Sequence, residues 1–132
     1  MSLKIVKVNG MDGVVTTIDV ATENMVYEFR GREIPDPTRT SVQIGRRHIE
    51  EDMIAYVNHS CTPNVSVEDM RYNDWNMFGT YALVSTGVMV AGDEITFDYN
   101  STEDEIAHPF ECSCHGTLIR GKKYVKHSSS NV

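Results

Sequence analysis

The sequence is short of cysteine and of long apolar runs, and each shortage excludes a class of protein. Its 132 residues include three cysteines, an odd number that favours reduced thiols over a disulfide framework. The apolar stretch 78–92 has no charged residue but is too short to cross a bilayer. No basic-then-apolar leader opens the chain, so we expect an intracellular protein, cytoplasmic or nuclear, that is neither secreted nor inserted in a membrane.

Basic side chains are also scarce, with 12 Lys and Arg against 19 Asp and Glu and a formal net charge of -7. Domains that bind nucleic acids usually present a basic face, so we expect no nucleic-acid partner. An acidic surface suits a basic partner, although it also simply keeps a protein in solution. The share of hydrophobic residues, 40%, and the length are those of one globular domain.

Short apolar runs separated by turn residues dominate the chain, and there is no internal repeat. The runs that alternate or are rich in β-branched residues are 4–8, 14–18, 25–29, 41–44, 65–67, 80–84, 88–90 and 95–99. Only residues 49–56 have the pattern of a helix, of about two turns. The sequence therefore predicts a mostly β domain with little helix.

The segment 56–64, Tyr-Val-Asn-His-Ser-Cys-Thr-Pro-Asn, places amide, imidazole, hydroxyl and thiol groups in consecutive positions. Such a polar run is a loop or a crossing rather than the centre of a strand. His59 and Cys61 could form a nucleophilic pair, but nothing in the segment supplies an orienting acid. A polar turn that satisfies its own backbone is the simpler interpretation.

Two later segments also contain side chains that could belong to a functional site. In 91–100, Ala-Gly-Asp-Glu-Ile-Thr-Phe-Asp-Tyr-Asn, a strand would place Phe97 and Tyr99 on one face. In 110–115, Phe-Glu-Cys-Ser-Cys-His, Cys112 and Cys114 are close enough to bind one metal ion, with Cys61 as a third ligand. Structural zinc sites use four ligands. The candidates for the fourth are His115, His108 and His127.

Taken in this order, Asn-His-Ser-Cys-x-Pro-Asn, Gly-Asp-Glu-Ile-Thr-Phe-Asp-Tyr and Cys-x-Cys resemble the motifs of the SET-domain protein lysine methyltransferases. The resemblance covers nearly the whole chain. It implies a β-clip fold of several small sheets with a threaded C-terminal segment, so that the Asn-His and Asp-Tyr motifs meet at one site. It also implies a SET domain over 1–109, a post-SET-like tail over 110–126 and a disordered end over 127–132.

The same resemblance implies a function and assigns roles to residues. Members of the family transfer a methyl group from S-adenosylmethionine to a lysine amine, so the expected partner is a basic, lysine-containing protein or peptide. Asn58 and His59 match the pair that contacts the methyl donor. Tyr99 matches the tyrosine at the methyl-transfer point, and Phe97 lines the lysine channel. The other positions expected to bind the donor are Asp12, Gly13 and Phe110.

Two positions differ from the family pattern and leave a second interpretation open. Met11 stands where the donor-binding motif has its first glycine, and Ala55 stands where a basic residue is common. Cys61, Cys112 and Cys114 match three of the four zinc ligands found in some members, so zinc is a further expectation. The alternative to an enzyme is a SET-like binding or dimerisation module without catalysis, which would form a homodimer.

Overall fold

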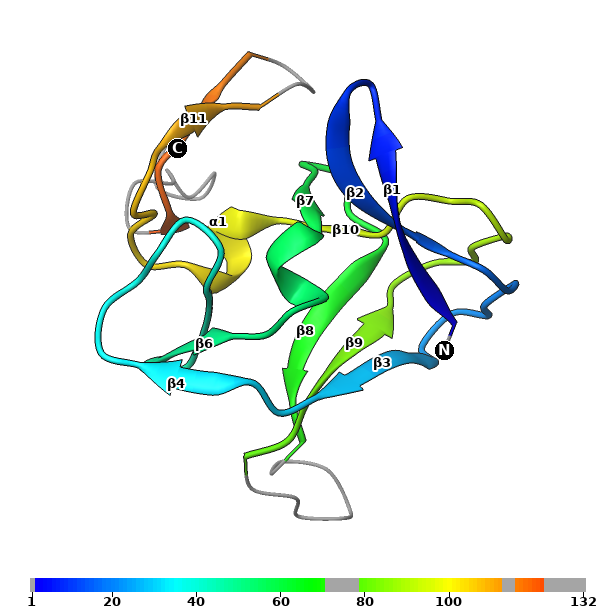
Figure 1. Ribbon diagram of the computed structural model, residues 1–132, viewed down its shortest axis with the longest axis horizontal. Helices are drawn as coiled ribbons and strands as arrows, with labels where there is room; N and C mark the ends of the chain where they lie inside the picture. The colour runs from blue at the N-terminus through cyan, green and yellow to red at the C-terminus, as the bar shows by residue number, and fades with distance from the viewer. Residues whose placement is uncertain (1, 71–78, 113–115, 123–132) are drawn as a thin grey trace, which may run out of the picture.

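The computed structural model describes residues 2–70, 79–112 and 116–122 (Figure 1). Within these ranges most of the regular structure is strand, and the helical parts are the 3₁₀ turn η1 (Ile54–Tyr56) and the single turn α1 (Tyr99–Thr102). The prediction of a mostly β fold with several small sheets and little helix is confirmed. None of the helices described is long and apolar enough to cross a membrane.

The body of the described structure is built from three antiparallel sheets. The first is the hairpin of β1 (Leu3–Val8) and β2 (Met11–Thr16), whose turn residues Asn9 and Gly10 have φ values of 51° and 82°. Positive φ at both turn positions matches the twist of the two strands. The second sheet has the order β3-β9-β8, comprising Met25–Phe29, Tyr81–Ser85 and Val65–Asp69. The third has the order β4-β6-β5, comprising Arg32–Ile34, Arg47–Glu50 and Val42–Ile44.

Apolar side chains from these sheets meet in one core. Phe29 and Tyr81 are register partners on the inner face of the second sheet, and their ring centroids lie 5.7 Å apart. Directly opposed residues of an antiparallel pair share a face, and the central strand β9 is buried on both faces at Tyr81, Ala82 and Leu83. Val14 of β2 and Ile95 are both 0% exposed, and the Ile95 N–H donates to the Val14 carbonyl at 2.7 Å. The first hairpin is thereby fixed to the segment that leads to Tyr99.

Three sequence-based predictions of local structure are wrong. Residues 49–56 do not form a two-turn helix, because β6 ends at Glu50 and only η1 is helical. The Glu51 carboxylate accepts two backbone N–H groups at this turn, and a strand cannot continue through such a turn. Residues 88–90 form one bridge, between Met89 and Val20, rather than a strand. In 95–99 only two residues are in a strand, and Tyr99 begins α1.

The C-terminal part of the chain returns to the centre of the molecule. Strand β10 (Thr96–Phe97) pairs in parallel with β7 (Asn58–His59), and a parallel pair requires a long crossover between its strands. Further along, β11 (Phe110–Glu111) and β12 (Leu118–Ile119) form a small antiparallel pair. In Figure 1, β11 and the β1–β2 hairpin lie on opposite sides of β7. The parallel pair therefore occupies the middle of the region where the sequence motifs converge.

Candidate active site

The parallel pairing of β7 and β10 brings together two motifs that lie some forty residues apart in the sequence. Phe97 is the register partner of His59, and the Ser60 N–H donates to the Phe97 carbonyl at 3.2 Å. Asn64, the last residue of the first motif, fixes the second: its Oδ1 accepts the Thr96 N–H at 2.9 Å and its Nδ2 donates to the Glu94 carbonyl at 2.8 Å. Sequence reasoning assigned Asn64 no role, although it lies within the quoted motif.

Tyr99 is attached at two points to the strand that carries the Asn-His pair. Its hydroxyl donates to the Val57 carbonyl at 2.6 Å, and its backbone N–H donates to His59 Nδ1 at 3.0 Å. The Tyr99 and Phe97 ring centroids lie 4.9 Å apart. Burial raises the pKa of the Tyr99 hydroxyl to about 12, with the Glu103 and Glu94 carboxylates adding to the shift. Tyr99 is therefore a neutral hydrogen-bond donor near pH 7 and not a base.

The His59 side chain is 2% exposed and lies among aromatic rings and sulfur atoms. Its ring centroid is 5.3 Å from that of Tyr99 and 5.7 Å from that of Phe110, both with edge geometry. On the other side its Nε2 lies 3.4 Å from Cys61 Sγ. Burial lowers the pKa of His59, and the Asp98 carboxylate opposes this shift without reversing it. The structure thus places His59, Tyr99 and Phe110 in a single aromatic cluster.

Asn58 and the first hairpin form the other side of the site. The Asn58 Nδ2 donates to the Asp12 carbonyl at 2.9 Å and to Glu94 Oε2 at 2.8 Å, which uses both amide hydrogens. No donor among the described residues contacts Asn58 Oδ1, so this oxygen can accept a hydrogen bond from a ligand. A Cβ atom at Gly13 would lie 2.9 Å from Glu94 Oε2 and 3.1 Å from Asn58 Nδ2. A side chain at Gly13 would crowd these two groups, whereas Met11 is 61% exposed.

Two of the predicted metal ligands lie together. Cys61 Sγ is 3.7 Å from Cys112 Sγ, and His59 joins them in a group whose ligand atoms all lie within 4.8 Å of one another. Two sulfurs bound at about 2.3 Å to a tetrahedral zinc ion are about 3.8 Å apart, so the sulfur spacing fits that metal. His108 is not part of this group. The remaining predicted ligands, Cys114, His115 and His127, lie outside the described residues.

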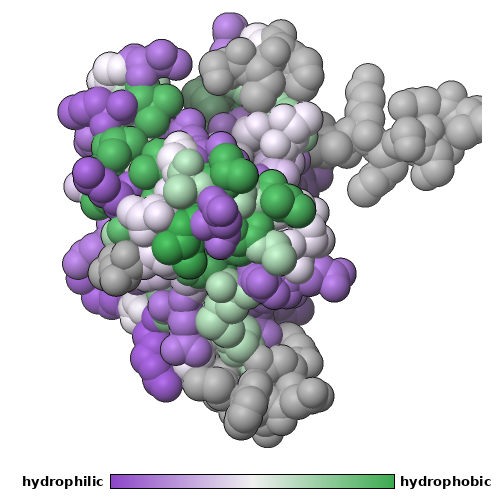
Figure 2. Space-filling view, turned by 90° about the vertical axis from the view of Figure 1, so that its right-hand side faces the viewer, coloured by the Kyte–Doolittle hydropathy of each residue, from purple (hydrophilic) through white to green (hydrophobic). Residues whose placement is uncertain are grey.

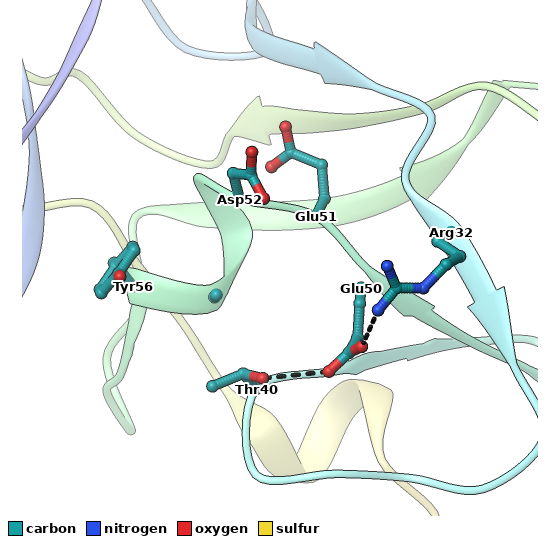
Figure 3. A pocket seen from close by; sticks show the side chains of 7 residues that line it. Arg32, Thr40, Glu50, Glu51, Asp52 and Tyr56 are labelled. Carbon is teal, nitrogen blue, oxygen red and sulfur yellow. Dashed lines mark hydrogen bonds and ion pairs between the residues drawn. The ribbon is translucent and has the colours of Figure 1, made fainter.

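A pocket of about 280 Å³ opens beside η1 and is lined by Ala55 and Tyr56 on the helical side (Figure 3). Its other lining side chains include Glu50, Glu51 and Asp52. Among the described residues that line it, Arg32 is the one cation; it donates to Glu50 Oε1 at 2.7 Å, and its charge is therefore compensated. The pocket favours a positively charged group over a carboxylate.

Comparison with known proteins identifies the family. The family model of the SET domain matches residues 16–100, which is well over half of the chain. The chain therefore belongs to the SET-domain family.

Three relatives are methyltransferases by name. A Yarrowia lipolytica histone-lysine N-methyltransferase, H3 lysine-36 specific, is 30% identical over 91% of this chain and 18% of its own length. The Caenorhabditis elegans histone-lysine N-methyltransferase met-2 is 38% identical over 46% of this chain and 5% of its own length. The Aspergillus flavus methyltransferase flvH is 36% identical over 61% of this chain and 42% of its own length. The chain thus spans less than half the length of each of these relatives.

Proposed function

We propose that this chain is an S-adenosylmethionine-dependent protein lysine N-methyltransferase. The observation that carries the proposal is the double attachment of Tyr99, through its hydroxyl and its N–H, to the strand of Asn58 and His59. The neutral phenol of Tyr99 thus lies beside the Phe97 ring and the segment of Asn58 and His59, which supports methyl transfer at this point. The methyltransferase names of the relatives support the same function.

The residues around Gly13 fit the methyl donor, which when bound supplies an electrophilic methyl group on a sulfonium. Asn58 Oδ1 is the acceptor that we assign to the donor's ammonium group. The missing side chain at Gly13 lets the backbone of β2 approach closely. Phe110, which contacts the rings of His59 and Tyr99, is the residue that we assign to the adenine.

The substrate lysine must be neutral to react, whereas its ordinary pKa is about 10.4. Phe97 is 4% exposed, and a lysine amine that reached its apolar surroundings would favour the uncharged form. Bound S-adenosylmethionine would supply the methyl group to the neutral amine nitrogen, with the thioether as the leaving group and one proton of the product ammonium lost to water. The Tyr99 oxygen can accept weak C–H hydrogen bonds from the methyl group, and its position aligns the two reactants.

A basic, lysine-containing protein or peptide is the substrate class that we propose. The acidic pocket of Glu50, Glu51 and Asp52 and the net charge of -7 both suit such a partner. We further propose an intracellular location, with the SET domain ending near residue 109 and the cysteine-bearing tail following it.

Zinc is the metal that we propose for Cys61, Cys112 and Cys114. The support is the 3.7 Å separation of the first two sulfurs, which is far from the bond length of about 2.05 Å in a disulfide. A bound zinc ion would link the Asn-His segment to β11 and would add its binding free energy to the stability of the tail.

Donor binding and product formation test this function. S-adenosylmethionine at saturation should raise the melting temperature of wild-type protein by mass action, and Asn58→Ala should abolish most of the shift. Mass spectrometry of a lysine-rich peptide library incubated with donor should show products heavier by one or more methyl groups. If the donor does not raise the melting temperature of wild type, or raises that of Asn58→Ala equally, the proposed function is wrong.

A dimerising module is the second candidate, and an apolar surface favours it. Exposed apolar side chains gather on the face shown in Figure 2. The bridge between Val20 and Met89 places Ile18 (53% exposed) near Val88 (75%) and Val90 (54%). Sedimentation equilibrium should detect a dimer that Val88→Glu dissociates, while Leu118→Glu, at another exposed apolar position, leaves it intact. A monomeric wild type would rule this candidate out.

A further inference from the structure

We propose that His59 is a positioning residue that joins the cysteine pair to Tyr99, and that it is not itself a metal ligand. The geometric grouping of His59 with Cys61 and Cys112 suggests a three-ligand site. The hydrogen bonds of the imidazole ring lead to a different assignment.

The contacts of Nδ1 determine which nitrogen carries the proton. The Tyr99 backbone N–H lies 3.0 Å from His59 Nδ1, and an amide N–H can only donate. Asp98 Oδ1 is farther away, at 3.6 Å, and already accepts the Asn100 N–H at 2.9 Å. Nδ1 must therefore be an unprotonated acceptor.

A neutral imidazole carries one hydrogen, so the hydrogen of His59 lies on Nε2. This nitrogen is 3.4 Å from Cys61 Sγ, within the range of hydrogen bonds to sulfur, and its N–H donates to that atom. A nitrogen that carries a proton has no lone pair for a metal ion. It also cannot take a proton from the Cys61 thiol, which excludes a nucleophilic pair of His59 and Cys61.

The two bonds make the ring a rigid connection between two functional parts. One edge orients Cys61 Sγ, which lies beside Cys112, as outer-shell donors orient metal ligands in other proteins. The other edge fixes the backbone of Tyr99 at the start of α1. With 2% exposure and edge contacts to the rings of Tyr99 and Phe110, the ring cannot shift without moving one of them. A change at the cysteine pair is therefore transmitted to the methyl-transfer tyrosine.

Nuclear magnetic resonance tests the assignment without reference to activity. A long-range ¹H–¹⁵N spectrum of wild-type protein near neutral pH should show His59 in the tautomer with Nε2 protonated, both before and after addition of zinc. The tautomer with Nδ1 protonated, or a loss of the Nε2 proton when zinc is added, would overturn the proposal.

Two substitutions separate the two edges of the ring. His59→Asn keeps an acceptor near the position of Nδ1 and removes the donor to Cys61. His59→Gln keeps an N–H group near the position of Nε2 and removes the acceptor for Tyr99. We expect His59→Asn to weaken cobalt binding about tenfold, the usual effect of losing an outer-shell partner, and His59→Gln to weaken it less. Cobalt absorption bands should be the same in wild type and His59→Gln, because the ligand set does not change.

Turnover should show the opposite order. In this arm, which rests on the proposed methyltransferase function, His59→Gln should lower kcat by about tenfold more than His59→Asn, with a smaller change in KM for the donor. Equal losses of turnover and metal affinity in both variants would indicate a merely structural histidine. Changed cobalt bands in His59→Gln would show that His59 is a ligand. A wild type that binds no cobalt would refute the part of the proposal in which His59 orients a metal ligand. A protein with the expected tautomer and cobalt data but no turnover would refute only the proposed function.

Discussion

The strand pairs β7–β10 and β11–β12 are equally short, yet different forces keep them in place. In the first pair Phe97 is 4% exposed, the adjoining Ile95 is 0% exposed, and the Asn64 side chain bonds to both the Thr96 N–H and the Glu94 carbonyl. In the second pair Ile119 is buried at 1% exposure, whereas Leu118 is 51% exposed. Its turn is closed by the Cys112 N–H, which donates to the Thr117 carbonyl at 2.8 Å.

The two strand pairs therefore depend on different interactions for their stability. The first pair belongs to the hydrophobic core, so its backbone pairing does not depend on a bound ligand or metal, and the His59 side chain links it to the cysteine pair. No residue of the second pair belongs to the core cluster, although Ile119 is buried, and we expect this pair to depend on the cysteine pair and on the contacts of Phe110. Substitutions and metal removal can test this difference directly.

The largest expected effect is on catalysis, and it comes from Tyr99, next to the β7–β10 pair. Tyr99→Phe should lower kcat by about 10²-fold. In the proposed mechanism the Tyr99 hydroxyl, which is held by its hydrogen bond to the Val57 carbonyl, acts on the transferring methyl group. Donor affinity, measured by calorimetry, should change little. Tyr81→Phe removes another buried tyrosine hydroxyl, one bonded to Arg47, and serves as the matched control. A Tyr99→Phe variant as fast as wild type would leave Tyr99 as a core residue only.

The next effect concerns the close approach at Gly13. Gly13→Ala should reduce donor affinity by about tenfold and destabilise the fold by about 1–3 kcal/mol, because its Cβ would lie 2.9 Å from Glu94 Oε2. Gly87→Ala is the control, since its Cβ would meet no atom within 4 Å. Calorimetry and thermal melts give the two quantities. Equal behaviour of the two variants would show that β2 does not approach Asn58 as described.

Metal removal should separate the two strand pairs. If zinc binds, a chelator should speed amide hydrogen exchange in 110–112 and 116–119 by about tenfold while 57–59 and 95–99 stay protected. Cys61→Ser should show the faster exchange already, with no further change on chelation. Equally faster exchange in both strand pairs would contradict the idea that only β11–β12 depends on the cysteine pair. If elemental analysis finds no zinc in wild type, a metal does not stabilise β11–β12.

The product spectrum gives a smaller, qualitative effect. Phe97 has no hydroxyl to bind a water molecule or the amine, so wild type should form di- or trimethyl-lysine. Phe97→Tyr adds a polar group to a side chain that is 4% exposed, and it should shift the products several-fold toward monomethyl-lysine. Mass spectrometry of the peptide products measures the ratio. Monomethyl-lysine as the main product of wild type would contradict the assigned channel position.

The smallest effect comes from Glu103, a 6% exposed carboxylate that accepts the Gln43 N–H at 2.5 Å. Burial raises its pKa, and the bond from Gln43 only partly opposes this. The native state therefore binds the Glu103 proton more tightly than the unfolded chain does. Folding stability is lost as pH rises from the unfolded pKa of about 4.3 through the raised pKa of the native state. Glu103→Gln should gain in melting temperature relative to wild type, by a few degrees, as pH rises across this window. Glu33→Gln, an exposed charge-matched control, should not.

The three motifs could be predicted to function together because their order along the chain resembles that of the SET-domain family. The roles of Phe97 and Tyr99 follow from the family resemblance and not from the alternation in 95–99, and the spacing of the cysteines suggests a metal site. The helix expected at 49–56 failed because a single carboxylate, Glu51, ends the strand by accepting two N–H groups, which periodicity does not report. The roles of Asn64 and Glu94 depend on bonds between segments about thirty residues apart, and no local pattern carries that information.

The sequence by itself determined the β class, the shortage of helix and the residue types of the site, because these follow from local alternation and composition. Only the tertiary structure decided that Tyr99 is attached to Val57 and His59, that Asn58 has both amide hydrogens occupied, and that His59 faces Cys61. The physical reason is the parallel pairing of β7 with β10. A crossover of nearly forty residues precedes that pairing, and its register is selected by burial of the core and by side-chain bonds, neither of which a short sequence window contains.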